Sequence, residues 1–224
     1  MATIELQASD GHKLSAYVAE PPKSNGKAVV IIQEIFGVNQ HIRGVADGYA
    51  RDGYLAIAAA LFDRVRPGIE MGYSDPEKQE GMQYAKRVSP DSLKDIEAAI
   101  AYAAGKVGAK HVGVVGFCFG GTLAWLAATR LNAAAAVAYY GGRIAENAAQ
   151  QPRCPVMLHF GKLDKHIGPE EWDKIRQAHP EVPLFLYDAG HGFNCELRSD
   201  YEPTSAKLAR ERTLDFLGKN LGGG

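Results

Sequence analysis

The chain has 224 residues and a net charge of −1, with basic and acidic residues mixed along its length, so it shows neither a nucleic-acid-binding surface nor a membrane patch. No stretch approaches 18 apolar residues, and the start lacks a basic region followed by an apolar one, so we expect no membrane span and no secretory signal. Three cysteines argue against a disulfide framework. We expect one cytoplasmic domain over 1–224, with reduced thiols, that is a monomer or a weak dimer.

Apolar runs and turn signals predict an opening hairpin, followed by strands that alternate with helices. The predicted strands are 3–6, 14–18, 28–32, 54–61, 112–117, 134–140, 156–160 and 184–187. The predicted helices are 41–52, 77–87, 92–105, 122–128, 169–178 and 205–216. The stretch 62–91, rich in proline, glycine and charge, indicates a flap over the sheet edge with one short helix. The pattern predicts an α/β fold whose central sheet is mostly parallel and carries helices on both faces.

The stretch 111–122, HVGVVGFCFGGT, predicts a buried strand, an abrupt turn and the start of a helix. This is the G-x-S-x-G elbow of nucleophilic hydrolases with Cys118 in place of serine. Any Cβ on Gly116 or Gly120 would clash where the helix start meets the strand end. A helix N-terminus beside Cys118 favours a thiolate, and the amide of Phe119 is placed to donate to an oxyanion. The alternative is a glycine-rich turn with an inert buried cysteine.

Polar side chains also follow other predicted strands, where ligand sites of parallel sheets gather. Glu34 comes after 28–32, Asp164 after 156–160 and His191 after 184–187. The order Cys118, Asp164, His191 matches nucleophile, acid and histidine in the α/β-hydrolase order. His191 would take the thiol proton, and Asp164 would orient its imidazole. Taken alone, the histidine is more typical of a surface residue, the aspartate of a turn, and Glu34 of a solvated or arginine-paired carboxylate.

A metal site is also conceivable from Cys118, His191 and Cys195. The chain has no C-x-x-C or H-x-x-x-H pair and no phosphate-binding loop, so we expect neither a metal nor a cofactor. Cys154 and Cys195 are interpreted as ordinary small residues.

The segments QEIFGVN, GFCFGG, AVAYYGG, GHGF and ERTLDFL, with the Asp164 turn, together resemble the dienelactone hydrolase (carboxymethylenebutenolidase) family over nearly the whole chain. The resemblance implies an α/β-hydrolase fold, no cofactor and a triad of Cys118, Asp164 and His191. It also implies that Glu34 meets the resting thiol and helps to deprotonate it. The amides of Ile35 and Phe119 are then expected to form the oxyanion hole.

The chain departs from the family at the substrate carboxylate, which bacterial members hold with one arginine in the flap and one shortly after the histidine. Neither arginine is matched, and Lys78 or Arg198 would have to substitute. The substrate-contacting candidates are Lys78, Tyr84, Tyr140 and Arg198. We therefore predict a thiol-dependent hydrolase of small lactones or activated esters, with little preference for an anionic substrate. The alternatives are a general small-ester or thioester hydrolase, and a non-enzymatic ligand-binding protein of the same fold.

Overall fold

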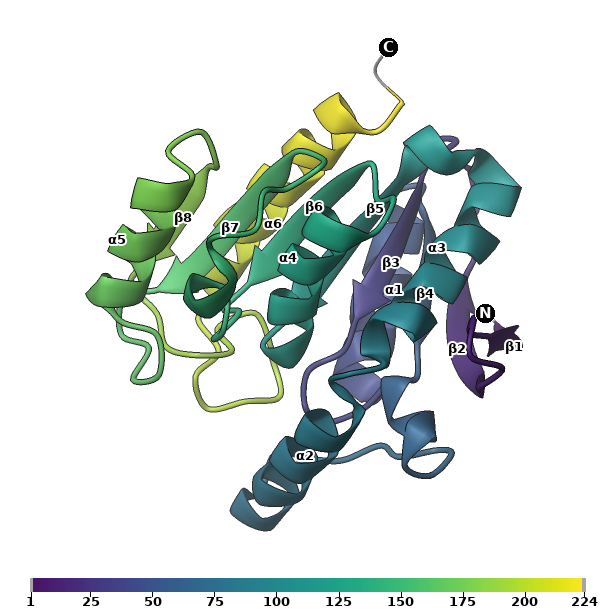
Figure 1. Cartoon of the computed structure of the whole chain (residues 1–224), viewed down its shortest axis with the longest axis horizontal. Coiled ribbons are helices and arrows are strands. Elements are labelled where there is room, and N and C mark those ends of the chain that lie inside the picture. The colour runs from purple at the N-terminus through teal and green to yellow at the C-terminus, as the bar shows by residue number, and fades with distance from the viewer. Residues whose placement is uncertain (1, 223–224) are drawn as a thin grey trace.

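All strands of the computed structural model, which describes residues 2–222, join one eight-stranded sheet (Figure 1). The strands are β1 Ala2–Gln7, β2 Lys13–Ala19, β3 Ala28–Ile32, β4 Leu55–Ala59, β5 Val112–Phe117, β6 Ala135–Tyr139, β7 Val156–Gly161 and β8 Leu184–Tyr187. Their order in the sheet is β1-β2-β4-β3-β5-β6-β7-β8. The β1–β2 and β2–β4 pairs are antiparallel, and all other pairs are parallel. The prediction of a mostly parallel sheet is confirmed.

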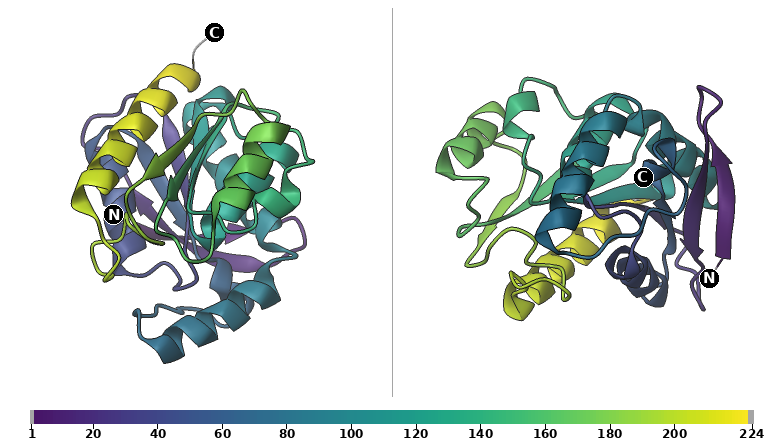
Figure 2. Two further views of the ribbon diagram at one scale, coloured as in Figure 1. Left: turned by 90° about the vertical axis from the view of Figure 1, so that its left-hand side faces the viewer. Right: turned by 90° about the horizontal axis from the view of Figure 1, so that it is seen from below.

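Helices cover both faces of the sheet. The α-helices of the described residues are α1 Gln40–Arg51, α2 Asp75–Val88, α3 Ser92–Val107, α4 Phe119–Arg130, α5 Pro169–Ala178 and α6 Pro203–Asn220. Helices α3, α4 and α5 lie on one face, and α1 and α6 lie on the other (Figure 2). Among the described residues, no helix has the length and apolar character needed to cross a bilayer.

The central strands are apolar on both faces because helices cover both. Every residue of β3, β4, β5, β6 and β7 is buried. Runs such as AVVII in β3 and VGVVGF in β5 are therefore continuous, without the alternation expected of a half-exposed strand. These strands form the core. Their carboxyl ends form a rigid edge that positions the loops following each strand.

Several elements differ in extent from the sequence expectation. The strand predicted over 54–61 ends at Ala59, and a 3₁₀ helix, η1 Leu61–Arg64, follows. There the Asp63 carboxylate accepts the amides of Ser15 and Gly68, which turns the chain away from the sheet. Helix α6 begins before and ends after its predicted range, 205–216. Two further 3₁₀ turns that we did not predict are η2 Ala109–His111 and η3 Ala145–Asn147.

The short helix expected at 77–87 is the 14-residue α2. It starts earlier because Glu77 accepts the backbone amide of Ser74 in a capping box. The signal, Ser74-x-x-Glu77, is visible in the sequence. In Figure 1, α2 lies beyond the carboxyl ends of the central strands, and so on the side where the predicted site residues gather.

Candidate active site

Cys118 occupies a strained turn between β5 and α4. Its φ is +54°, a left-handed conformation that is unusual for a residue other than glycine. The flanking glycines make the turn possible: a Cβ on Gly116 would lie 1.8 Å from the carbonyl oxygen of Gly120. A Cβ on Gly120 would lie 2.2 Å from the carbonyl oxygen of Ile32. The expected steric reason for both glycines therefore holds, and the turn presents Cys118 at the carboxyl edge of the sheet.

His191 joins Cys118 and Asp164 in one hydrogen-bonded chain. Its Nδ1 lies 2.7 Å from Asp164 Oδ2, and its Nε2 lies 3.2 Å from Cys118 Sγ. The other carboxylate oxygen of Asp164 accepts the backbone amide of His166 at 2.8 Å, which holds the carboxylate in place. The structure thus brings together three residues that the sequence places far apart, each in a loop after a different parallel strand.

The charges around His191 favour the protonated form of its imidazole. Burial by itself would lower the pKa of His191, but the negative charge of Cys118 and the hydrogen bond to Asp164 raise this pKa to about 10. Burial opposes ionisation of Asp164, yet the hydrogen bonds from His191 and from the His166 amide lower the pKa of Asp164. The arrangement therefore stabilises a positive charge on the His191 imidazole.

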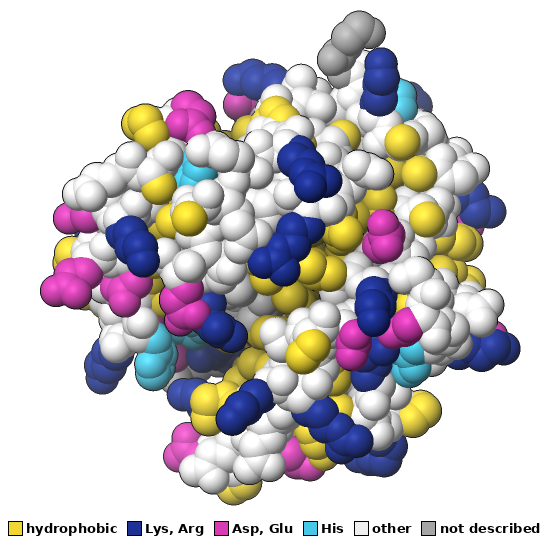
Figure 3. Space-filling model, viewed as in Figure 1, with side chains coloured by type: hydrophobic (Ala, Val, Ile, Leu, Met, Phe, Trp, Pro, Cys, Tyr) yellow, Lys and Arg dark blue, Asp and Glu magenta, His cyan; other side chains and the backbone are white. Residues whose placement is uncertain are grey.

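A cavity of about 460 Å³ opens onto Cys118 and His191. Most of its wall is apolar, formed by Ile35, Pro90, Leu93, Phe119, Leu123 and Leu126. Two arginines, Arg130 and Arg143, also line it. Figure 3 shows hydrophobic side chains in a hollow of this face, with basic side chains beside it. The cavity suits a small, largely apolar molecule with its reactive group next to the sulfur.

None of the four expected substrate contacts lines this cavity. Lys78 and Tyr84 are on α2 and do not line this cavity; the Tyr84 hydroxyl donates to the Glu80 carboxylate. Tyr140 is fully buried and also outside the cavity wall, with its ring centre 5.1 Å from that of His191. It supports the imidazole and does not face the cavity. These residues are absent from the cavity wall because α2 extends away from the sheet and the Tyr140 ring turns into the core.

Arg198, the fourth candidate, also lies outside the cavity wall but contacts Glu34. The guanidinium Nη1 donates to Glu34 Oε1 at 3.3 Å; the Arg198 side chain is largely buried and that of Glu34 fully buried, with exposed fractions of 11% and 1%. Gly192 leaves room for this contact, because a Cβ there would lie 2.5 Å from the guanidinium. The sequence left open whether Glu34 is solvated, paired with an arginine or in contact with the thiol; in the structure it is paired with an arginine. Its carboxylate meets Arg198, while the thiol of Cys118 meets His191.

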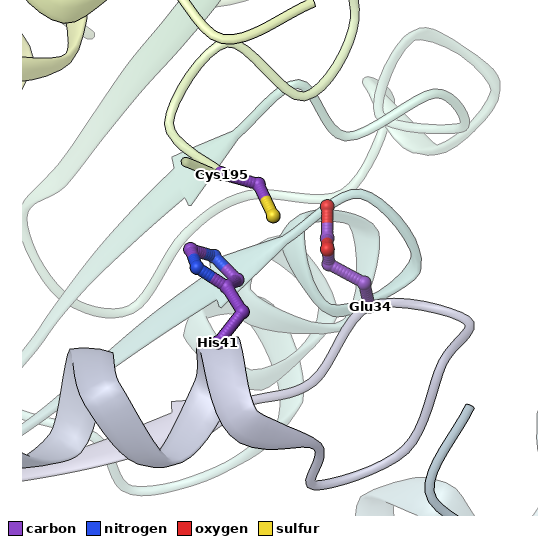
Figure 4. A group of neighbouring side chains, drawn as sticks. All are labelled: Glu34, His41 and Cys195. Carbon is purple, nitrogen blue, oxygen red and sulfur yellow. The ribbon is translucent and has the colours of Figure 1, made fainter. Parts of the chain in front are cut away.

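Glu34 also belongs to a second buried group, which the sequence did not lead us to expect. One carboxylate oxygen of Glu34, a ring nitrogen of His41 and the sulfur of Cys195 all lie within 4.8 Å of one another. Figure 4 shows the three side chains converging from the loop after β3, the start of α1 and the loop after β8. The conceivable cluster of Cys118, His191 and Cys195 is not what forms, since Cys195 faces the other group.

Comparisons with known proteins show which family this sequence and fold resemble. The sequence profile of the dienelactone hydrolase family matches residues 14–221. The chain is 35% identical to a carboxymethylenebutenolidase of Pseudomonas putida over 224 residues, covering 96% of this chain and 94% of the relative. It is also 35% identical to a putative carboxymethylenebutenolidase of a Synechocystis strain, covering 93% of each.

The chain belongs to the dienelactone hydrolase family. A crystal structure of a putative dienelactone hydrolase from Klebsiella pneumoniae superposes with a TM-score of 0.84 at 30% identity, covering 98% of this chain and all of that one. The predictions of an α/β-hydrolase fold and of a carboxylic ester hydrolase are confirmed. Ile35 and Phe119, the expected oxyanion-hole residues of this family member, both line the cavity beside Cys118.

Proposed function

We propose that this family member hydrolyses small lactones or activated carboxylic esters through Cys118, His191 and Asp164. The observation that carries the proposal is the hydrogen-bonded chain from Asp164 Oδ2 through His191 to Cys118 Sγ, beside a cavity of about 460 Å³. A thiol, a base and a group that orients the base are the parts that covalent acyl transfer requires.

In the first half of the reaction, His191 Nε2 takes the proton of Cys118 and the sulfur attacks the carbonyl carbon. The carbonyl oxygen becomes an oxyanion, which the backbone amides of Ile35 and Phe119 stabilise. When the tetrahedral intermediate collapses, the bond to the leaving oxygen breaks and that oxygen takes the proton from His191. The product of this half is a thioester on Cys118. For a lactone, the released hydroxyl stays attached to the acyl group.

In the second half, His191 takes a proton from water and the resulting hydroxide attacks the thioester carbonyl. The carbon–sulfur bond breaks, the sulfur recovers the proton from His191, and the carboxylic acid leaves. Asp164 remains ionised throughout and holds the imidazole with Nδ1 protonated. Its lowered pKa is consistent with this role.

The test is a comparison of thiol variants with an activated aryl ester as substrate. We expect Cys118→Ala to be inert and Cys154→Ala to retain the wild-type rate, since burial raises the pKa of Cys154 to about 11 and it lies away from the cavity. Iodoacetamide should label Cys118 first. Normal turnover by Cys118→Ala would refute the mechanism, and product limited to one equivalent of enzyme would indicate a covalent binding protein.

Glu34 is proposed to assist deprotonation of the thiol, as the family resemblance implies. It directly precedes Ile35, which lines the cavity, and its carboxylate has only one oxygen engaged by Arg198. Loss of a general base typically slows a reaction by about 100- to 10,000-fold. Glu34→Gln should therefore lower kcat on the aryl ester while the overall fold persists by circular dichroism. An unchanged kcat in the folded variant would limit Glu34 to its pairing with Arg198.

The cavity favours a neutral or weakly anionic substrate. Its only lining arginines, within the described residues, are exposed: Arg143 pairs with Glu146 at 2.8 Å and Arg130 donates to Gln150 at 2.8 Å. Exposed charge pairs contribute about 0.2–1 kcal/mol, or roughly fivefold or less in specificity. We therefore propose activity on neutral small esters as the second candidate function.

Measurement of kcat/KM on a lactone carboxylate and a neutral aryl ester of similar size decides between the two substrate classes. A preference within about fivefold, reduced further in Arg130→Ala or Arg143→Ala, supports a general small-ester hydrolase. A preference for the anion above about 100-fold would overturn this substrate assignment. Its loss in Arg198→Met would then assign the carboxylate to Arg198.

A further inference from the structure

The group of Glu34, His41 and Cys195 combines one oxygen, one nitrogen and one sulfur donor in the interior. All three residues are buried, and their donor atoms lie within 4.8 Å of one another. Figure 4 shows the side chains pointing toward a common centre. Nothing in the proposed hydrolysis requires His41 or Cys195, so the convergence of these donors needs another explanation.

Two side-chain atoms of this group find no hydrogen-bond partner within residues 2–222. They are Glu34 Oε2 and His41 Nε2, both fully enclosed by protein. An unsatisfied buried carboxylate oxygen or ring nitrogen costs about 1–3 kcal/mol or more, and native structures contain few of them. Two such atoms converging on a thiol indicate a missing ligand. We propose that Glu34, His41 and Cys195 form a binding site for a thiophilic divalent cation of the Zn²⁺ type.

Donor chemistry and size fit this cation. Thiolate, imidazole and carboxylate are the ligands that Zn²⁺ takes in proteins, at about 2.0–2.3 Å from the metal. In a tetrahedral arrangement these bond lengths place the donor atoms about 3.3–3.7 Å apart. The donors of the group are at most 4.8 Å apart, so an approach of about 1 Å closes the site. Side-chain torsions supply a movement of this size without rearranging the sheet.

The surroundings of the group orient two of the three donors. Glu196 Oε2 lies 3.0 Å from His41 Nδ1, so it accepts the proton at Nδ1 and leaves Nε2 as the free electron pair. A carboxylate behind the histidine is the usual outer partner of a metal-bound imidazole. Cys195 Sγ lies 3.2 Å from the Tyr73 hydroxyl, which itself accepts from the Asn39 amide at 3.1 Å. That hydroxyl retains its own proton and can donate it to a Cys195 thiolate.

Charge balance also favours a divalent cation. A Cys195 thiolate and the Glu34 carboxylate carry two negative charges, which one divalent ion neutralises when His41 is neutral. The adjacent charges also balance, because Arg198 binds the other oxygen of Glu34 and Glu196 faces His41. The occupied site is therefore neutral overall, as a buried charge cluster needs to be.

Occupation of the site has a consequence for hydrolysis that rests on the proposed role of Glu34. A cation bound to Glu34 Oε2 withdraws this carboxylate from thiol activation, so the occupied enzyme is slower. Zn²⁺ thus acts as an inhibitor at a site that is distinct from Cys118 and His191.

The test measures metal binding independently of turnover, with Co²⁺ as a spectroscopic probe. The variant is Cys118→Ser/Cys154→Ser, which leaves Cys195 as the one thiol of a chain with three cysteines. After chelator treatment, we expect both wild type and this variant to bind one equivalent of Co²⁺ with a thiolate-to-metal charge-transfer band. Zn²⁺ should displace the Co²⁺ and abolish the band.

Glu196→Gln should weaken metal binding without abolishing it. Glu196 is half exposed and is not one of the proposed catalytic groups. Loss of such an outer partner typically lowers metal affinity by about 10- to 100-fold. We expect that loss in Co²⁺ affinity, and an equal increase in the Zn²⁺ needed to inhibit ester hydrolysis. Absence of the band with excess Co²⁺, or its loss in the double variant when circular dichroism shows a native fold, overturns the proposal. If the double variant does not fold, loss of the band in Cys118→Ser alone also overturns the metal-site proposal. Wild-type turnover without the band overturns the metal site but leaves the hydrolase proposal intact.

Discussion

Replacement of Arg198 by methionine tests whether the buried pair with Glu34 holds the site together. Methionine keeps much of the length of the side chain but removes the one hydrogen-bond donor to the Glu34 carboxylate among residues 2–222. Removing one partner of a buried ion pair costs about 3–5 kcal/mol, since it leaves the other charge enclosed. This pair has a single contact of 3.3 Å, and Arg198 lies 3.9 Å from Asp200 as well, so we expect the lower end, about 3 kcal/mol.

Urea unfolding followed by circular dichroism measures this loss. With a slope near 3 kcal/mol per molar, Arg198→Met should lower the midpoint by about 1 M without changing the slope. Arg198→Met/Glu34→Gln should lose less than the sum of the single variants, because no charge then remains buried. Lys219→Met, which breaks an exposed pair with Asp215, is the control and should cost under about 1 kcal/mol. A loss below about 1 kcal/mol in Arg198→Met, with additive single effects, would refute the reasoning.

Three further predictions follow from local geometry and charge. Gly120→Ala should lower the free energy of unfolding by at least about 3 kcal/mol, because its Cβ would lie 2.2 Å from a backbone carbonyl oxygen. Gly105→Ala, in open space within α3, should raise the free energy of unfolding by about 0.5–1 kcal/mol. The urea midpoints of the two variants measure this difference. Burial, with a contribution from a nearby arginine, lowers the pKa of His159 to about 3, so the unfolded state binds a proton that the native state does not between about pH 6.5 and 3. The free energy of unfolding should fall with decreasing pH in that window by up to about 1.4 kcal/mol per unit, and His159→Gln should flatten the slope. Asp164→Asn should lower the pKa of His191, which NMR titration of the imidazole measures; no change would argue that their hydrogen bond is absent in solution.

The sequence was sufficient for the sheet and for the chain that joins Cys118, Asp164 and His191. Parallel strands align their carboxyl ends, so polar residues that follow such strands must meet at one edge. The pairing of Glu34 with Arg198 was not predictable in the same way. It depends on how the irregular loop after β8 folds back, and on the space left by Gly192.

The same limit explains why the buried group was missed and why the four candidate substrate contacts do not line the cavity. His41 belongs to the first turn of α1 and Cys195 to a loop, and no short spacing such as C-x-x-C relates them to Glu34. Tyr140 was a candidate substrate contact at the end of the predicted strand 134–140, but that position does not fix the direction of a ring. Its φ of +40° turns the backbone sharply there, and the side chain ends in the core.

Because β8 lies at the edge of the sheet, the loop that carries His191 is less stably held than the turn that carries Cys118. This strand has four residues, three of them only partly buried, and pairs on one side only, whereas β5 beneath Cys118 is enclosed on every side. Edge segments with few buried contacts open locally at lower free energy than the core. Fraying of β8 would carry the loop with His191 away while the elbow stays intact. Inactivation by mild denaturant should then precede the loss of helical signal, and hydrogen exchange should report the 184–187 amides as the first strand amides near the site to lose protection.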